Sequence, residues 1–106
     1  QAEQATLEFI KKHCPPQTGL LCGNSIWQDR LFLRRYMPSI TDYVNYRMVD
    51  VTSVKEMVYR WYPNNQQLGF AKADKHRAMP DVYESIEELK HYRKYFFITP
   101  SASDLA

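Results

Sequence analysis

The sequence lacks any large excess of charge, any long apolar run and any internal repeat. Its formal net charge of +2 is too small to predict a protein that grips long nucleic acids by neutralising phosphates, although a short substrate would need only a local basic cluster. No apolar run approaches the length of a membrane span and no signal peptide is recognisable, so we expect a cytoplasmic protein with no membrane partner. With 106 residues, the chain is expected to form at most one small globular domain.

Cysteine is also scarce, because only Cys14 and Cys22 are present. A structural disulfide is not expected between them, since such bonds are rare in reducing compartments. Cys22 follows Leu20 and Leu21 in a short apolar run and is interpreted as a small buried hydrophobe. Neither cysteine has the spacing to histidine that is typical of a zinc site, so we expect no zinc.

The hydrophobic pattern predicts helices that alternate with short strands, which is an α/β arrangement. The predicted helices cover residues 1–13, 26–36, 53–61 and 80–96, the predicted strands cover residues 20–23 and 46–51, and a polar loop covers residues 63–75. A strand, a helix and a second strand in succession predict a parallel pair. Two strands make a marginal sheet, so further strands must come from elsewhere.

Local signals set the ends of these helices. Asn24 and Ser25 offer side-chain caps for the helix that starts at residue 26, and Pro38 ends that helix. Residues 53–56 (SVKE) have the pattern of a capping box, which predicts a helix start at Ser53. The last helix is expected to begin near Pro80, because proline is favoured in a first turn.

Asp29 follows the first predicted strand, in the first turns of the next helix. In open α/β sheets, ligands bind at the carboxyl ends of strands, close to helix N-termini. A carboxylate at this place can hold a ligand, or it can simply interact favourably with the helix dipole. For Asp29 taken alone, the second interpretation is the stronger one.

His76 and Asp81 flank the boundary between the polar loop and the last predicted helix. A two-metal phosphodiesterase needs carboxylate oxygens to hold the ions and a base that can take a proton from the attacking water. His76 and Asp81 are suitable types for these two roles. A surface histidine near a helix-start aspartate is nevertheless the simpler interpretation of the pair in isolation.

Groups that bind phosphates lie at both ends of the second predicted strand. Tyr46 and Arg47 stand at its start, and Thr52 and Ser53 at its end. An arginine fork and hydroxyl groups are typical of phosphate recognition, and an aromatic ring can stack on a base. The alternative is a tyrosine at a strand end and hydroxyls that cap a helix.

Together and in this order, these segments resemble the oligoribonucleases, which are 3′→5′ exonucleases of the DEDD superfamily. Residues 23–33 (GNSIWQDRLFL) resemble the second exonuclease motif of that family, and residues 36–38 (YMP) follow. Residues 46–56 (YRMVDVTSVKE) resemble its next block, and residues 76–86 (HRAMPDVYESI) resemble its third motif. The resemblance covers nearly the whole chain.

This resemblance implies a ribonuclease-H-like α/β fold and the hydrolysis of very short RNAs, down to dinucleotides, into mononucleotides. Residues 1–98 would form the C-terminal part of one exonuclease domain that starts upstream, and residues 99–106 would form a flexible tail. By position, Asp29 and Asp81 match catalytic carboxylates that bind Mg²⁺ or Mn²⁺. His76 matches the general base that activates water.

The resemblance also implies how the substrate is held. The implied substrate-binding residues are Ser25, Gln28, Tyr46, Arg47, Thr52 and Ser53. Of these, Ser25, Arg47, Thr52 and Ser53 match polar groups around the terminal phosphate of a very short RNA. Tyr46 matches a tyrosine that reaches into the partner's active site in a homodimer. A blocked end of the binding site would explain a preference for dinucleotides.

The sequence departs from the family pattern at three places. Pro80 replaces a common acidic residue, Asn45 replaces a common histidine, and the first motif, an Asp-x-Glu pair that binds both metal ions, appears nowhere in these residues. We therefore expect the chain alone to have little or no activity. Two other interpretations stay open, namely a non-catalytic nucleotide-binding or dimerisation fragment and a related DEDD exonuclease that acts on DNA.

Overall fold

A computed structural model of the chain describes residues 2–69 and 78–98, and for residues 78–80 it describes the backbone alone. His76, the end of the polar loop and the expected tail at 99–106 lie outside the described residues. The chain divides into two compact units, Gln1–Thr52 and Ser53–Ala106. None of the helices in the described ranges is long and apolar enough to cross a membrane.

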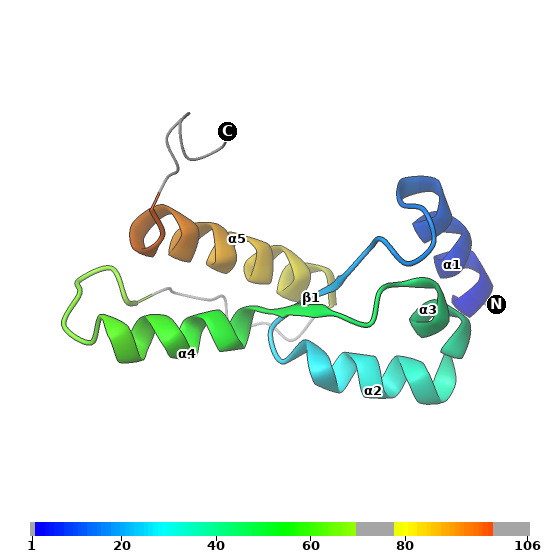
Figure 1. Cartoon of the computed structure of the whole chain (residues 1–106), viewed down its shortest axis with the longest axis horizontal. Coiled ribbons are helices and arrows are strands. Elements are labelled where there is room, and N and C mark those ends of the chain that lie inside the picture. Colours follow the sequence, from blue (N-terminus) through cyan, green and yellow to red (C-terminus); the bar gives the residue numbers. More distant parts are fainter. Residues whose placement is uncertain (1, 70–77, 99–106) are drawn as a thin grey trace. The chain divides into compact units, whose positions relative to one another are not determined.

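The first unit contains a two-stranded parallel sheet and three helices (Figure 1). In chain order its elements are α1 (Ala2–His13), β1 (Leu21–Gly23), α2 (Ile26–Tyr36), α3 (Pro38–Tyr43) and β2 (Met48–Asp50). Strand β1 pairs with β2 so that Leu21 lies opposite Met48 and Gly23 lies opposite Asp50. The predicted parallel pair is therefore confirmed, and so is the predicted helix at 26–36.

Helix α3 was not predicted, because Pro38 was interpreted only as the residue that ends α2. Pro38 does lie just beyond α2, which ends at Tyr36, but it also stands in the first turn of α3. Proline is tolerated there, since its missing N–H would have no partner inside the helix and its fixed φ suits a helix start. The same residue thus ends one helix and begins the next.

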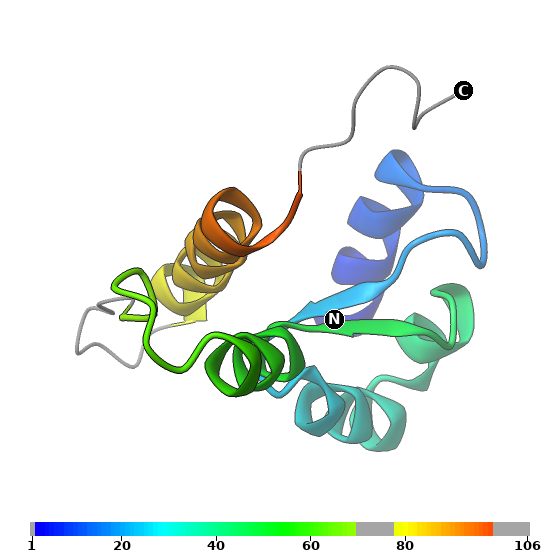
Figure 2. The ribbon, with the colours of Figure 1, turned by 60° about the vertical axis from the view of Figure 1, so that its left-hand side comes forward.

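The core of the first unit is small and is built from single residues of several elements. Its buried apolar residues are Leu7 on α1, Ile26 on α2, Ile40 on α3, Val44 after α3 and Val51 after β2. Ile40 and Val44 are four positions apart, so both fall on one side of a helical turn. Helix α2 lies along the strand pair, as the turned view in Figure 2 makes visible. These contacts fix the ends of both strands next to the start of α2.

Strand β1 was predicted to be buried on both faces, and this prediction is wrong. Leu20 and Cys22 are exposed, and Met48 and Val49 on β2 are each 37% exposed. A strand is buried on both faces only when the sheet continues on its sides and helices cover it. Over the described part of the chain the sheet has two strands, which leaves these side chains accessible.

Helix α4 (Val51–Trp61) begins two residues before the predicted start. The proposed capping box at residues 53–56 is therefore wrong, and Glu56 pairs with Arg60 one turn later instead. Asp50 acts as the cap, because its Oδ1 accepts a hydrogen bond from the N–H of Thr52 at 2.9 Å. An aspartate that directly precedes a helix satisfies one of the free amides of the first turn.

The second unit holds α4 from Ser53 onward and α5 (Ala78–Phe96). A buried polar pair lies inside it. The Tyr92 hydroxyl donates to Glu88 Oε2 at 2.5 Å, one helical turn away, and the two residues are 0% and 1% exposed. Burial raises the pKa of the Tyr92 hydroxyl, and the hydrogen bond to Glu88 raises this pKa further. The Tyr92 hydroxyl therefore keeps its proton to a higher pH than an exposed tyrosine does.

Replacing Tyr92 with Phe should lower the free energy of unfolding by about 1–3 kcal/mol, because the hydrogen bond from the Tyr92 hydroxyl to buried Glu88 Oε2 is lost. Unfolded Tyr92 would ionise near the ordinary pKa of 10.0, below its folded pKa, so the unchanged chain should also lose stability as the pH rises above 10. Denaturant melts at pH 7 and at increasing alkaline pH measure both effects. A weaker alkaline loss in Tyr92→Phe is expected, and Tyr95→Phe on the same helix, at an exposed position, serves as the control.

Candidate functional site

The two strand-to-helix junctions of the first unit are joined by a cluster of hydrogen bonds. Its members are Asn24 and Ser25, which follow β1, and Asp50 and Thr52, which lie at the end of β2 and in the first turn of α4. The parallel register brings them together, since Gly23 and Asp50 are opposite each other and the chain turns into a helix after each. The carboxyl ends of parallel strands meet at one edge of the sheet, which is where α/β proteins bind ligands.

Asp50 is the centre of this cluster. Its Oδ1 accepts the N–H of Ser25 and the N–H of Thr52, each at 2.9 Å. A single carboxylate oxygen thus holds the backbone at two helix starts that are far apart in the sequence. This role of Asp50 was not predicted, although an aspartate at the end of a predicted strand and two residues before a threonine is the signal of a helix cap.

The hydroxyl groups of the cluster form a directed chain. Thr52 Oγ1 is 3.1 Å from Asn24 Oδ1, to which it donates, and it accepts the N–H of Ser25 at 3.0 Å. Because a threonine hydroxyl has one hydrogen, Ser25 Oγ must be the donor in its 3.3 Å contact with Thr52 Oγ1. The two hydroxyls, predicted from separate motifs, therefore lie side by side.

Ser25 has a left-handed backbone, with φ 51° and ψ 43°. This conformation is uncommon for a residue with a side chain. It also explains why Ser25 makes no side-chain cap for α2, contrary to the prediction, since a capping side chain needs an extended backbone to reach the amides of the first turn. The hydroxyl points to Thr52 instead, and Ser25 is partly buried.

Asp29 and Gln28 lie in the first turn of α2, and both are exposed. The Gln28 N–H donates to the carbonyl of Ser25 at 3.0 Å, so the turn that carries Asp29 is fixed directly to the hydroxyl cluster. The Asp29 carboxylate stands at the positive end of the helix dipole, where a negative charge is stabilised. It is available to a ligand from solvent.

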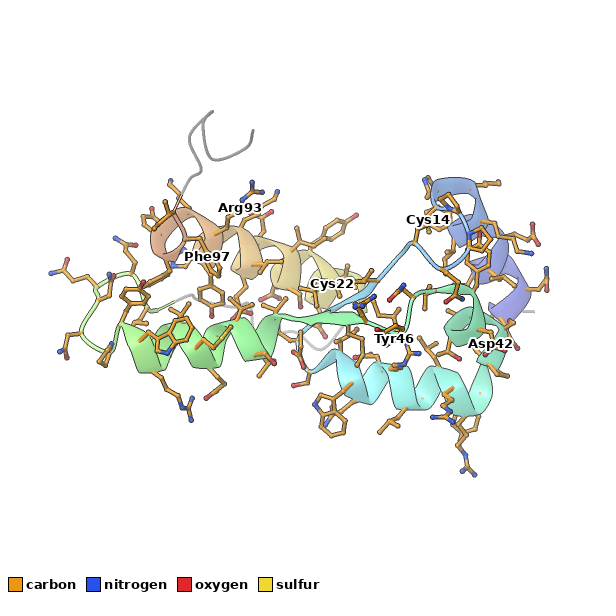
Figure 3. The ribbon with its side chains drawn as sticks, viewed as in Figure 1. Cys14, Cys22, Asp42, Tyr46, Arg93 and Phe97 are labelled. Carbon is orange, nitrogen blue, oxygen red and sulfur yellow. The ribbon has the colours of Figure 1, made fainter. Side chains whose placement is uncertain are left out.

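Tyr46 and Arg47 lie on the segment that leads into β2, where Figure 3 labels Tyr46. The Arg47 guanidinium stands over the Tyr46 ring at 4.7 Å, and the ring is 65% exposed. Asn45 fixes this segment, since its Oδ1 accepts the N–H of Arg47 at 2.9 Å and its Nδ2 donates to the carbonyl of Gln17 at 2.9 Å. Asn45, which stands where the family commonly has a histidine, thus holds the Tyr46–Arg47 segment in place.

The remaining predicted residues belong to the second unit. Asp81 lies in the first turn of α5 and Ser53 on α4, and both are exposed. His76 lies outside the described residues. The structure therefore brings Ser25 and Thr52 together, with Gln28 and Asp29 on the adjoining turn.

The described carboxylates do not by themselves fit a two-metal centre. Among residues 2–69 and 78–98, no three histidine, cysteine, aspartate or glutamate side chains gather closely enough to hold one ion. Each ion of such a centre needs several oxygen ligands, usually supplied in part by carboxylates that bridge both ions. Asp29 and Asp81 supply one carboxylate each, which is fewer than two ions require.

Both cysteines are free thiols, Cys14 after the end of α1 and Cys22 on β1 (Figure 3). Partial burial raises the pKa of the Cys22 thiol, and the negative charge of Asp50 raises this pKa further. The thiolate is the reactive form, so an exposed thiol in this place is less reactive than its exposure suggests.

In a Cys14→Ser background, Cys22 should react with iodoacetamide more slowly in the folded chain than in the urea-unfolded chain at pH 8. Replacing Asp50 with Asn should make the folded reaction faster, because it removes the charge that disfavours the thiolate. The rates are measured by mass spectrometry over time. Equal rates with and without the Asp50 charge would contradict this account of the thiol.

The chain is similar to known proteins over most of its length. A family model described as exonuclease (RNase_T) matches residues 1–89. The chain is 52% identical over 96 residues to the oligoribonuclease of Acinetobacter baylyi, which is 91% of the chain and 52% of that protein. It is 53% identical over 93 residues to the oligoribonuclease of Francisella tularensis subsp. novicida, which is 88% of the chain and 51% of that protein. The chain spans about half the length of the curated relatives it matches.

Proposed function

The chain belongs to the exonuclease family, and from that membership we propose that it is the C-terminal portion of a 3′→5′ exoribonuclease that degrades very short RNAs. The proposed products are mononucleotides, released from substrates as short as dinucleotides. The observation that carries the proposal is the pair of hydroxyls on Ser25 and Thr52, 3.3 Å apart. They come from two segments that independently resemble oligoribonuclease motifs.

The hydroxyl pair is suited to a terminal phosphate. Hydroxyl groups donate to phosphate oxygens, and the N-terminal end of α2 favours a negative charge. The present bonds are internal, from Ser25 Oγ to Thr52 Oγ1 and from Thr52 Oγ1 to Asn24 Oδ1. A rotation of the Ser25 hydroxyl frees its hydrogen for a phosphate oxygen without moving the backbone. We propose that Ser25, Gln28, Thr52 and Ser53 bind the substrate at this place, next to its terminal phosphate.

Tyr46 and Arg47 are proposed to extend this binding site. The planar guanidinium can form two parallel hydrogen bonds with phosphate oxygens, and the exposed Tyr46 ring can contact a base or a second protein chain. The exposure of Tyr46, at 65%, supports the proposal that it reaches into the partner's site in a homodimer.

For catalysis we propose that the complete protein uses Mg²⁺ or Mn²⁺, which would stabilise negative charge on the phosphate and activate water. Asp29 and Asp81 would supply two of the ligands, and carboxylates absent from this chain would supply others. His76 would take the proton from the attacking water. We also propose a cytoplasmic location and no zinc.

A second candidate function is a nucleotide-binding or dimerisation fragment without catalysis. It is favoured by the absence of an Asp-x-Glu pair from the sequence. Affinity for a dinucleotide that does not depend on Mg²⁺, together with no cleavage in any assembled form, would support it. A related exonuclease that acts on DNA is a third candidate, and equal affinity for ribose and deoxyribose dinucleotides would support that one.

Titration calorimetry of the 106-residue chain tests the proposed binding. We expect 5′-phosphorylated diadenylate to bind more tightly than the same dinucleotide without its terminal phosphate, by about tenfold for one additional charged hydrogen bond. Replacing Ser25 with Ala should remove most of this difference. Ser39→Ala on α3 is the matched control in the same unit. Identical affinity for both dinucleotides would refute the phosphate site.

A further inference from the structure

We propose that Asp50 is a positioning residue for the terminal-phosphate site, which fixes the backbone of Ser25 and Thr52 so that their hydroxyls meet. This inference rests on the proposed function and adds a residue that contacts no substrate itself. Asp50 Oδ1 accepts the amides of both residues at 2.9 Å. One carboxylate oxygen thereby joins the two helix starts.

The bond to Ser25 is more than a helix cap requires. To cap α4, Asp50 needs only the N–H of Thr52, two residues ahead. The N–H of Ser25 comes from a residue 25 positions earlier and contributes nothing to the start of α4. Its consequence lies at the other junction, where it holds Ser25 beside Thr52.

The left-handed backbone of Ser25 needs such support. A residue with a side chain keeps φ near 51° only when surrounding contacts fix it. The Ser25 N–H has two acceptors, Asp50 Oδ1 at 2.9 Å and Thr52 Oγ1 at 3.0 Å. Without the carboxylate oxygen, Ser25 can relax toward an ordinary helix-capping conformation, and its hydroxyl would then turn away from Thr52.

The proposed positioning role belongs to the acceptor oxygen of Asp50, which holds both amides, and not to its charge. A negative charge next to a bound phosphate opposes binding, although the two amides it accepts reduce this effect. Asp50→Asn retains an oxygen in the same position and removes the charge. Asp50→Ser retains a helix-capping oxygen but places it one bond closer to the backbone, too short to reach both amides.

The test is titration calorimetry of the 106-residue chain with diadenylate, with and without a 5′-phosphate. Asp50→Ser should lose about tenfold in affinity for the phosphorylated dinucleotide and nothing for the unphosphorylated one. Asp50→Asn should bind both within about twofold of the unchanged chain. Glu3→Ser is the matched control, since Glu3 Oε2 accepts the N–H of Ser39 at 3.0 Å near the start of α3 in the same unit.

Each outcome of this titration tests either the positioning role of Asp50 or the proposed function on which that role rests. If the unchanged chain discriminates for the phosphate and Asp50→Ser discriminates equally well, the positioning role is wrong. An equal loss in Glu3→Ser would mean general loosening of the unit, which also overturns it. A loss of about tenfold in Asp50→Asn would overturn it, whether or not Asp50→Ser folds. No discrimination by the unchanged chain would refute the proposed function, and this inference with it.

Discussion

The 106-residue chain alone should hydrolyse a 5′-labelled diribonucleotide at no measurable rate with either Mg²⁺ or Mn²⁺. Its sequence contains no Asp-x-Glu pair, and its described residues do not gather three metal-binding side chains. Joining it to the part of the Acinetobacter baylyi oligoribonuclease that it does not match should give a protein that releases mononucleotides. We expect that part to carry the Asp-x-Glu pair of the first motif, whose carboxylates would complete the ligands that two ions need.

Gel separation of the labelled products measures this difference. Intact mass must be checked first, so that the sample tested alone is the 12.6 kDa chain. As a control, the joined protein should lose activity when the added Asp-x-Glu pair is changed to Asn and Gln. Metal-dependent turnover by the 12.6 kDa chain itself would contradict the expected inactivity.

Replacing Asp81 with Asn in the joined protein should lower kcat at least about a thousandfold, because a proposed metal ligand, which would contribute several kcal/mol to transition-state stabilisation, is removed. Asp29→Asn should have a comparable effect. Both carboxylates are exposed and lie in the first turn of a helix, so their substitution should cost the fold little. Single-turnover rates at saturating Mg²⁺ give the comparison.

The matched control is Asp42→Asn, an exposed carboxylate on α3 that belongs to no motif. It should leave kcat within about twofold, as surface substitutions usually do. A similar kcat in Asp81→Asn and Asp42→Asn would mean that Asp81 is a helix-start residue and no more. That is the simpler interpretation that the sequence alone favoured for it.

Helix α2 and the parallel strand pair could be predicted from the sequence because both depend on local pattern. Residues 26–36 have a helical composition between a turn and a proline, and strands separated by one helix are generally parallel. Helix α3 could not be predicted in this way. It has six residues, and the residue that starts it, Pro38, is also the residue that stops α2.

The hydroxyl cluster shows a second limit of what could be predicted from the sequence. Ser25 and Thr52 could be singled out as phosphate-binding types, but their contact depends on a register that pairs Gly23 with Asp50. The role of Asp50 depends on the same register. One of its amide partners, Thr52, is two residues away, and the other, Ser25, follows the paired strand β1. The exposure of Cys22 likewise depends on how many strands flank it, and a short apolar run carries no information about that.

Competition between substrates tests the central proposal most directly. The joined protein is given equal amounts of a 5′-labelled diribonucleotide, the corresponding deoxydinucleotide and a ten-nucleotide RNA, and the products are followed over time. We predict that the diribonucleotide is converted to mononucleotides first, because the proposed phosphate site would block the path of longer chains. Preferred cleavage of the ten-nucleotide RNA, or equal cleavage of the deoxydinucleotide, would contradict an exoribonuclease for very short RNA.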